Sequence, residues 1–208
     1  MPEERAAMLR DLRAYGIRDE RVLAAMGRVP RDAFIPAAAR RGDAYGDHPL
    51  PIGHGQTISQ PYIVAYMTEL VEPGPGRKLL EIGTGSGYQA AILAELGASV
   101  FSLEVVPELV THAREVLGAQ GYDVRIRLGD GYEGWPEESP FDAVIGTCAA
   151  DAVPETLCRQ LKIGGVLVMP IGGVDHQRIV LVRRTASGFD RHEDLPVRFV
   201  PMVHIARR

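Results

Sequence analysis

The chain has 208 residues, of which 46% are hydrophobic and 24% are charged, proportions that are typical of globular proteins and exclude a mainly disordered chain. The 23 basic and 27 acidic residues give a net charge of −4. The chain therefore lacks the excess of basic residues that is typical of proteins that bind nucleic acids or membrane surfaces. No apolar run reaches the ~20 residues that span a bilayer. The charged N-terminus lacks a signal-peptide core, and two cysteines make no disulfide scaffold. We therefore expect one soluble, cytoplasmic α/β domain over residues 1–208.

Residues 1–72 are expected to form N-terminal helices and a long loop. Apolar residues recur at helical spacing over residues 2–26, with a break near Gly16. From Arg41 to Gln60, repeated glycine and proline residues leave little room for regular structure, and a loop of this length is often a lid or a binding loop. Ser59, followed by Pro61, is a candidate cap for a helix that continues to about residue 70.

Residues 73–208 are expected to form the core of the fold. Strand and helix patterns alternate along this part, which predicts a doubly wound, mostly parallel sheet. The expected strands are 78–82, 99–103, 124–128, 141–145 and 165–171, and the expected helices are 88–96, 107–119 and 154–161. Two more strands, 178–184 and 197–204, are joined by a polar turn over 185–194 without a helix, which predicts antiparallel strands at one edge. The expected sheet has seven strands and a Rossmann-like topology.

The most informative segment is the glycine turn at residues 83–87, Gly-Thr-Gly-Ser-Gly, directly after the first core strand. Glycines at this place allow a tight turn and a close approach of a ligand to the backbone. A dinucleotide site would need a glycine at position 88, which is Tyr88. Glu104 ends the next strand, where a carboxylate reaches ribose hydroxyls. Asp130 and Gly131 follow the third strand and are placed to meet an adenine amino group.

Glu81 distinguishes between the possible nucleotides. It lies two residues before the first glycine, where a carboxylate would repel a pyrophosphate but would suit an ammonium group. S-adenosylmethionine has an amino acid end, a ribose and an adenine, and it carries no phosphate. An ordinary α/β domain can also carry turn glycines and surface acids, so the prediction rests on the whole set. The residues expected to bind S-adenosylmethionine are Glu81, Gly83, Gly85, Gly87, Glu104, Asp130 and Gly131.

Two further segments resemble the protein-L-isoaspartate O-methyltransferase family. Residues 49–61, PLPIGHGQTISQP, are similar almost residue for residue to the substrate loop of that family, and residues 129–135, GDGYEGW, resemble its adenine-side loop. The resemblance runs from about Met26 to Pro201. It implies a class I methyltransferase fold with S-adenosyl-L-methionine as methyl donor. The implied reaction is transfer of a methyl group to the α-carboxylate of L-isoaspartyl residues in damaged proteins and peptides.

The resemblance also implies that Ser59 is the catalytic residue and that Thr57, Ile58, Gln60 and Thr147 contact the substrate. A carboxylate with a pKa near 4 is already ionised at neutral pH, so the chemistry requires no general base. The protein has mainly to align the two reacting groups and to exclude water. We expect the Ser59 hydroxyl and nearby backbone N–H groups to orient the acceptor beneath the loop. The methyl ester would then cyclise to a succinimide, which water reopens partly to normal aspartate.

Three other side chains have two open interpretations. His54 either contacts the substrate or is a solvated loop residue, and Gln177 either lies near the donor or is an edge-strand residue. Cys148 follows the fourth strand and is expected to be a buried, inert thiol. The six histidines show no metal-ligand spacing, so no metal is predicted.

Two alternative functions remain open at this point. The first is a related enzyme that esterifies aspartate in a biosynthetic peptide to install an aspartimide, and the second is a module that binds the donor without catalysis. An isoaspartyl peptide assayed beside its aspartyl isomer separates the first alternative, whereas donor binding without methyl ester identifies the second. We expect isoaspartyl-containing proteins and peptides as substrates, a monomer, and no nucleic-acid or membrane partner.

Overall fold

The computed structural model describes residues 3–37, 39 and 43–205. Residue 2, where the expected first helix begins, and residues 41–42, where the expected loop begins, lie outside the described residues. The helices, with η marking a 3-10 helix, are α1 (Glu3–Ala14), α2 (Glu20–Arg28), η1 (Arg31–Phe34), α3 (Pro61–Val71), α4 (Tyr88–Glu95), α5 (Pro107–Ala119), η2 (Pro136–Glu138) and α6 (Glu155–Arg159). The strands are β1 (Leu50–Gly53), β2 (Gln56–Ile58), β3 (Lys78–Ile82), β4 (Ser99–Glu104), β5 (Val124–Leu128), β6 (Phe141–Gly146), β7 (Leu161–Ile171), β8 (Gln177–Arg184) and β9 (Phe189–Val197).

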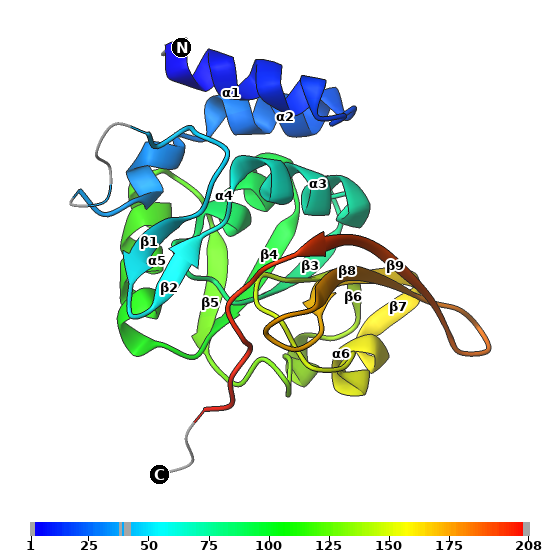
Figure 1. The fold of residues 1–208 in the computed structure, drawn as a ribbon. Helices are drawn as coiled ribbons and strands as arrows, with labels where there is room; N and C mark the ends of the chain where they lie inside the picture. The colour runs from blue at the N-terminus through cyan, green and yellow to red at the C-terminus, as the bar shows by residue number, and fades with distance from the viewer. Residues whose placement is uncertain (1–2, 38, 40–42, 206–208) are drawn as a thin grey trace.

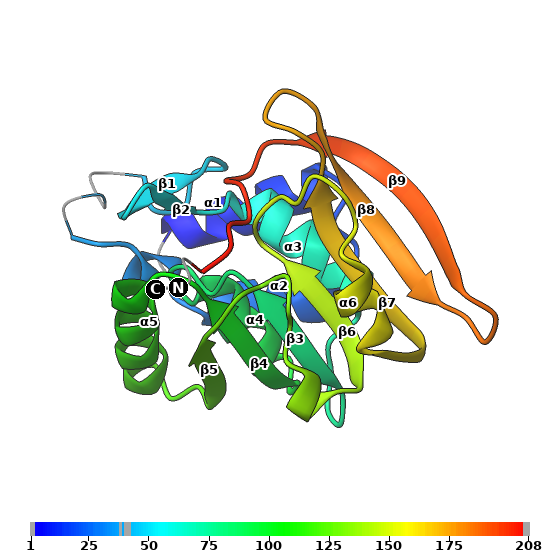
Figure 2. The ribbon, with the colours of Figure 1, turned by 90° about the horizontal axis from the view of Figure 1, so that it is seen from below.

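Seven strands form one sheet in the order β5-β4-β3-β6-β7-β8-β9 (Figures 1 and 2). The strands from β5 to β7 are parallel, β8 is antiparallel to β7, and β9 is antiparallel to β8. The predicted sheet, mostly parallel with antiparallel strands at one edge, is therefore confirmed. The chain leaves β3 towards β4 and β5 and then returns to β6 on the other side of β3, so the strand order reverses between β3 and β6.

Alternating side chains of the strands pack into two hydrophobic layers, because successive residues of a strand point to opposite faces. On one face, sheet residues such as Leu79 and Ile145 share a buried cluster with apolar residues of α1 to α5. On the other face, Leu80 and Val144 pack with Leu157 of α6. Figure 1 shows α1 and α2 above α3 and α4, so the N-terminal helices belong to the same core as the sheet. Among the described residues, no helix has the length and hydrophobicity that crossing a bilayer requires.

The expected long loop contains a β-hairpin, which the sequence analysis did not predict. Strands β1 and β2 pair antiparallel, and both contribute one buried isoleucine, Ile52 and Ile58. The residues that join them, Gly53, His54 and Gly55, all have positive φ values of 90°, 54° and 71°. Glycines that weakened the strand prediction are therefore the residues that close the hairpin.

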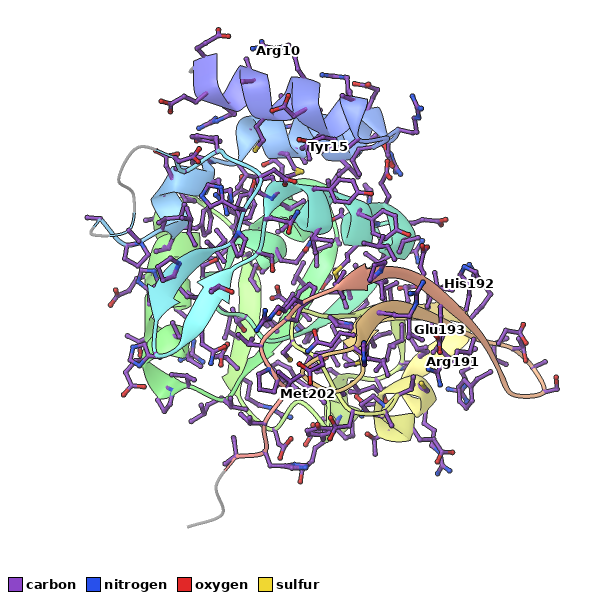
Figure 3. All side chains as sticks on the ribbon, in the orientation of Figure 1. Arg10, Tyr15, Arg191, His192, Glu193 and Met202 are labelled. Carbon is purple, nitrogen blue, oxygen red and sulfur yellow. The ribbon has the colours of Figure 1, made fainter. Side chains whose placement is uncertain are left out.

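The predicted position of the last strand, 197–204, is wrong. The chain turns already at residues 185–188, where the Thr185 N–H donates a hydrogen bond to the Gly188 carbonyl oxygen at 2.8 Å, and β9 follows at once. Strand β9 is an edge strand with exposed charged residues, labelled in Figure 3 at Arg191 and Glu193, so it carries no apolar pattern. Residues 198–205 instead cross the end of the sheet, where the Met202 N–H donates to the Ala149 carbonyl oxygen at 2.7 Å.

Candidate active site

The candidate active site is a cavity at the carboxyl ends of β3, β4 and β6, where the strand order reverses. Ligands of open α/β sheets bind at this position because the connecting loops diverge there. The cavity has a volume of about 780 Å³, including its mouth to solvent, which suits a ligand of nucleoside size. The predicted residues that line it are Thr57, Ile58, Ser59, Glu81, Gly83, Gly85, Glu104, Gly131 and Thr147.

Three predicted residues do not line this cavity. Gly87 is the N-cap of α4, and Gln60 lines a second, adjacent cavity. Asp130 lies beside the C-terminal segment: its Oδ1 accepts the Tyr132 N–H at 2.9 Å, and its Oδ2 is 2.9 Å from Nδ1 of His204. The imidazole of His204 also stacks on the Tyr132 ring, with centroids 4.2 Å apart. The predicted contact of Asp130 with adenine would therefore compete with His204.

Glu81 combines complete burial with an incomplete set of hydrogen bonds. It lies in β3 directly opposite Ser102 of β4, whose hydroxyl donates to its Oε2. Its Oε1 atom is buried and has no hydrogen-bond partner among the described residues. Burial, together with the charge of Glu104, raises the pKa of Glu81 to about 8, although the Ser102 hydroxyl lowers it. An ammonium group in the cavity would supply the partner that this carboxylate lacks.

Glu104 holds the glycine turn in place. Its Oε2 accepts the Gly85 N–H at 2.8 Å, and its Oε1 accepts the N–H groups of Val105 and Val106 at 2.8 and 3.0 Å. The side chain is almost completely buried and still lines the cavity. A carboxylate oxygen accepts about two hydrogen bonds, so Oε2, which accepts only the Gly85 N–H among the described residues, retains the capacity to accept a ligand hydroxyl.

Gly83 has a conformation and a neighbour that exclude a side chain. Its φ is +95°, in the region that favours glycine, and a Cβ atom there would lie 2.6 Å from the hydroxyl oxygen of Thr147. Its N–H donates to the Leu103 carbonyl oxygen at 2.8 Å, which joins the turn to the end of β4. The turn therefore brings backbone, rather than side chains, to the wall of the cavity.

We expect Gly83→Ala to abolish most binding of S-adenosylmethionine and to lower the free energy of unfolding by about 1–3 kcal/mol, because alanine is strained at this φ and its Cβ meets Thr147. Gly118→Ala is the matched control. Gly118 is exposed in α5 with nothing within 4 Å of an added Cβ, so its replacement should leave binding unchanged and stabilise by up to about 1 kcal/mol. Calorimetric titration and urea denaturation measure both effects. Wild-type donor affinity in Gly83→Ala would contradict this account of the turn.

Ser59 is not the cap of α3, as its sequence position suggested. The helix begins at Pro61, so Gln60 is the N-cap residue, and Asp47 accepts the Tyr62 N–H at 2.8 Å in place of a local side chain. Among the described residues, the Ser59 hydroxyl has no hydrogen-bond partner. The one-residue shift of the helix start thus leaves this hydroxyl available at the cavity wall.

A second cavity adjoins the first and shares four of its lining residues, Thr57, Ser59, Thr147 and Val200. It has a volume of about 670 Å³, including its opening to solvent. Its remaining lining residues are Pro49, Gln60, Tyr62, Ile63 and residues 195–199. Ser59 therefore lies where the two cavities meet. His54 is at the tip of the β1–β2 hairpin and lines neither of them.

Thr147 and Cys148 follow β6 on the opposite wall. The Thr147 hydroxyl lies within hydrogen-bond distance of the carbonyl oxygens of Ile82 and Gly83, so it fastens β6 to the start of the glycine turn. Cys148 is buried, and burial together with Glu104 and Glu81 raises the pKa of its thiol to about 12. Such a thiol is protonated at neutral pH, which fits the predicted inert role.

Several features of the site were not predicted. Ser102 is a polar residue within an apolar strand, and this break in the pattern was a usable signal. The parallel register pairs it with Glu81. Residues 200–203 line the cavity after crossing the end of the sheet, and Asp47 caps α3 from 15 residues away, for which no local pattern exists. Gln177 lines neither cavity but binds the backbone of Phe199 through both amide atoms, at 3.1 and 2.6 Å, and so fixes the C-terminal segment.

Comparison with known proteins places this site in a family. A family model for protein-L-isoaspartate(D-aspartate) O-methyltransferase matches residues 3–207. The protein-L-isoaspartate O-methyltransferase of Gloeobacter violaceus is 52% identical over 193 residues, covering 92% of this chain and 94% of that protein. Protein-L-isoaspartate O-methyltransferase 2 of Polaromonas sp. is 50% identical over 208 residues, covering 97% and 98% of the two chains.

Solved structures agree with this assignment. A protein-L-isoaspartate O-methyltransferase structure has a TM-score of 0.85 at 30% identity, covering 95% of this chain and 65% of that chain. A Plasmodium falciparum structure described as the same kind of enzyme, in complex with S-adenosyl-L-homocysteine, has a TM-score of 0.83 at 27% identity, covering 95% and 97%. The resemblance seen in residues 49–61 and 129–135 is confirmed. The chain belongs to the protein-L-isoaspartate(D-aspartate) O-methyltransferase family.

Proposed function

We propose that this protein transfers a methyl group from S-adenosyl-L-methionine to the α-carboxylate of L-isoaspartyl residues in damaged proteins and peptides. The observation that carries the proposal is a single continuous site, with a buried unpaired carboxylate oxygen on Glu81 in one cavity and the hydroxyl of Ser59 where that cavity meets a second one. The relatives at about half identity bear the name of this activity, which supports the same reaction.

The donor cavity fits S-adenosylmethionine in its chemistry. Glu81 would pair with the ammonium group, the backbone of Gly83 and Gly85 would lie against the amino acid end, and Glu104 would accept from the ribose hydroxyls. Gly131 would leave room for the adenine, because a side chain at this position would enter the cavity wall, with its Cβ only 2.5 Å from Cγ2 of Ile82. When bound, the donor supplies an electrophilic methyl group on a positively charged sulfur atom.

On the acceptor side, the protein aligns a carboxylate that is already ionised. The Ser59 hydroxyl donates to no group in the described part of the chain, and Thr57 and Thr147 share its position between the two cavities. The residues of the second cavity, Gln60 among them, would receive the polypeptide on either side of the isoaspartyl residue, and Ile58 lines the adjoining donor cavity. Exclusion of water by the two bound reactants would strengthen the attraction between their charges.

Incubation with labelled donor and a peptide containing one L-isoaspartyl residue tests this function. We expect a base-labile methyl ester on that peptide and little on its normal aspartyl isomer, because the free carboxylate of an isoaspartyl residue is attached to the α-carbon, whereas the free carboxylate of an aspartyl residue is one methylene farther from it. Preferential esterification of the aspartyl isomer would favour the aspartimide-forming alternative. Donor binding without any ester would favour the non-catalytic module.

A further inference from the structure

Arg31 is a buried cation with an unusual set of partners. Its side chain is completely buried in η1, and among the described residues its guanidinium donates hydrogen bonds only to backbone carbonyl oxygens. Nη1 binds the Ala44 oxygen, and Nη2 binds the oxygens of His48 and Ser59 at 3.2 and 3.1 Å. Three separate points of the chain before α3 thus converge on one side chain.

Arg31 has no carboxylate partner in the part of the chain that the structure describes. Among the described residues, no Asp or Glu oxygen lies within ion-pair distance of its guanidinium, and its Nε is buried without a hydrogen-bond partner. Asp43 and Asp47 act on it only from farther away, and burial lowers its pKa. An arginine remains charged under such conditions. Burial of this cation costs free energy, and its hydrogen bonds to three carbonyl groups offset part of that cost.

The carbonyls that Arg31 binds belong to the segment that carries the acceptor site. Ala44 and His48 flank Asp47, which caps α3 through the Tyr62 N–H and also accepts from Gln60 Nε2 at 3.1 Å. The third carbonyl is that of Ser59, the residue whose hydroxyl lies between the two cavities. Residues 43–48 and the start of α3 are therefore joined in two ways. Arg31 binds carbonyl groups of both segments, and Asp47 binds Gln60 and the Tyr62 N–H directly.

We propose that Arg31 is a positioning residue that sets the place of the Ser59 hydroxyl for the methyl acceptor. Arg31 lines neither cavity, so it acts through the backbone of Ser59 rather than on either reactant. A planar guanidinium with five N–H donors spans several carbonyls at once, whereas a lysine ammonium acts as a point charge on a flexible stem. This role rests on the proposed function, because it concerns the alignment of that acceptor.

Arg31→Lys tests the role because it keeps the charge and removes the fork. We expect kcat/KM for an isoaspartyl peptide to fall at least about tenfold, mainly through kcat as in Ser59→Ala, because loss of the hydrogen bonds from the charged fork to Ser59 and its neighbours displaces the hydroxyl that aligns the acceptor. The calorimetric affinity for S-adenosylmethionine should stay within about twofold of wild type. Arg28→Lys is the matched control: Arg28 lies three residues away in an exposed ion pair with Glu95, and its replacement should change neither quantity.

Arg31→Ala provides a second test through chemical rescue. Methylguanidinium at millimolar concentration should restore part of the lost kcat/KM, whereas methylammonium, which carries the same charge without the planar fork, should restore much less. Equal rescue by the two cations, or no rescue in a variant that binds donor normally, would overturn the proposal.

The outcomes are distinguishable from failure of the proposed function. If the wild-type protein forms no ester on the isoaspartyl peptide, the result contradicts the proposed function rather than the positioning role of Arg31. If wild type is active and Arg31→Lys keeps wild-type kcat/KM, the inference fails alone. If Arg31→Lys loses donor affinity to the same extent as peptide turnover, Arg31 maintains the whole fold rather than the acceptor segment, and the proposal is overturned.

Discussion

Glu81→Gln should weaken binding of S-adenosylmethionine by roughly 30-fold or more, because loss of one partner from a buried charged pair costs about 2–5 kcal/mol. The amide keeps the size of the side chain and its place opposite Ser102, so the cavity itself should persist. Calorimetric titration measures the affinity. Glu108→Gln is the control, since Glu108 is exposed in the first turn of α5, and it should bind as wild type does.

The same carboxylate predicts a pH dependence with a defined sign. The pKa of Glu81 in the donor-free protein is raised to about 8 by burial, so this group is mostly protonated at neutral pH. Pairing with an ammonium group requires the carboxylate, so donor binding should release a proton and should strengthen from pH 6 to pH 7.5. Titrations in buffers of different ionisation enthalpy measure that proton. Glu81→Gln should release none, and an identical pH profile in the two proteins would contradict the pairing.

The stability of the donor-free protein should change with pH in the opposite sense. The folded pKa of Glu81 lies above the value of an unfolded glutamate, so its contribution to stability is present at low pH and is lost as pH rises through about 8. Glu81→Gln should lack this loss. Urea denaturation at several pH values, with Glu108→Gln as the control, separates this effect from the titration of other groups.

Ser59→Ala should lower kcat for an isoaspartyl peptide by about tenfold to 100-fold while leaving donor affinity unchanged, because one hydrogen bond to a charged acceptor contributes about 1.5–3 kcal/mol. The free energy of unfolding should hardly change, since Asp47 rather than Ser59 caps α3. Ser187→Ala, in the exposed turn before β9, is the matched control. Steady-state kinetics and urea denaturation measure the two quantities.

Two results would contradict this role of Ser59. Unchanged turnover in Ser59→Ala would show that the acceptor is aligned by other groups. A loss of stability that parallels the loss of turnover would show that the hydroxyl supports the fold, in spite of the cap that Asp47 provides.

Much of the fold was predictable because most of its strands are apolar runs that are buried on both faces, while the edge strand β5 still alternates apolar residues with arginines. That pattern gave β3 to β7 and the parallel order, and with it the meeting point of Glu81, Gly83, Glu104 and Thr147, since the carboxyl ends of parallel strands lie at one edge. Strand β9 escaped prediction because it is an exposed edge strand, whose charged residues are determined by solvent rather than by a core.

The parts of the site that the sequence did not reveal depend on contacts between distant residues. Arg31 reaches Ser59 across 28 positions, Asp47 reaches Tyr62 across 15, and Gln177 reaches Phe199 across 22. Each of these bonds joins a side chain to the backbone, so no complementary residue type marks the partner. Local periodicity predicts elements, whereas these contacts appear only when the elements are packed together.

A crystal structure with S-adenosyl-L-homocysteine and an isoaspartyl peptide tests the central claim most directly. We expect the ligand amino group within hydrogen-bond distance of Glu81 Oε1, and the peptide carboxylate beside the Ser59 hydroxyl, facing the sulfur atom. An amino group bound away from Glu81, or a peptide carboxylate remote from Ser59, would contradict the account.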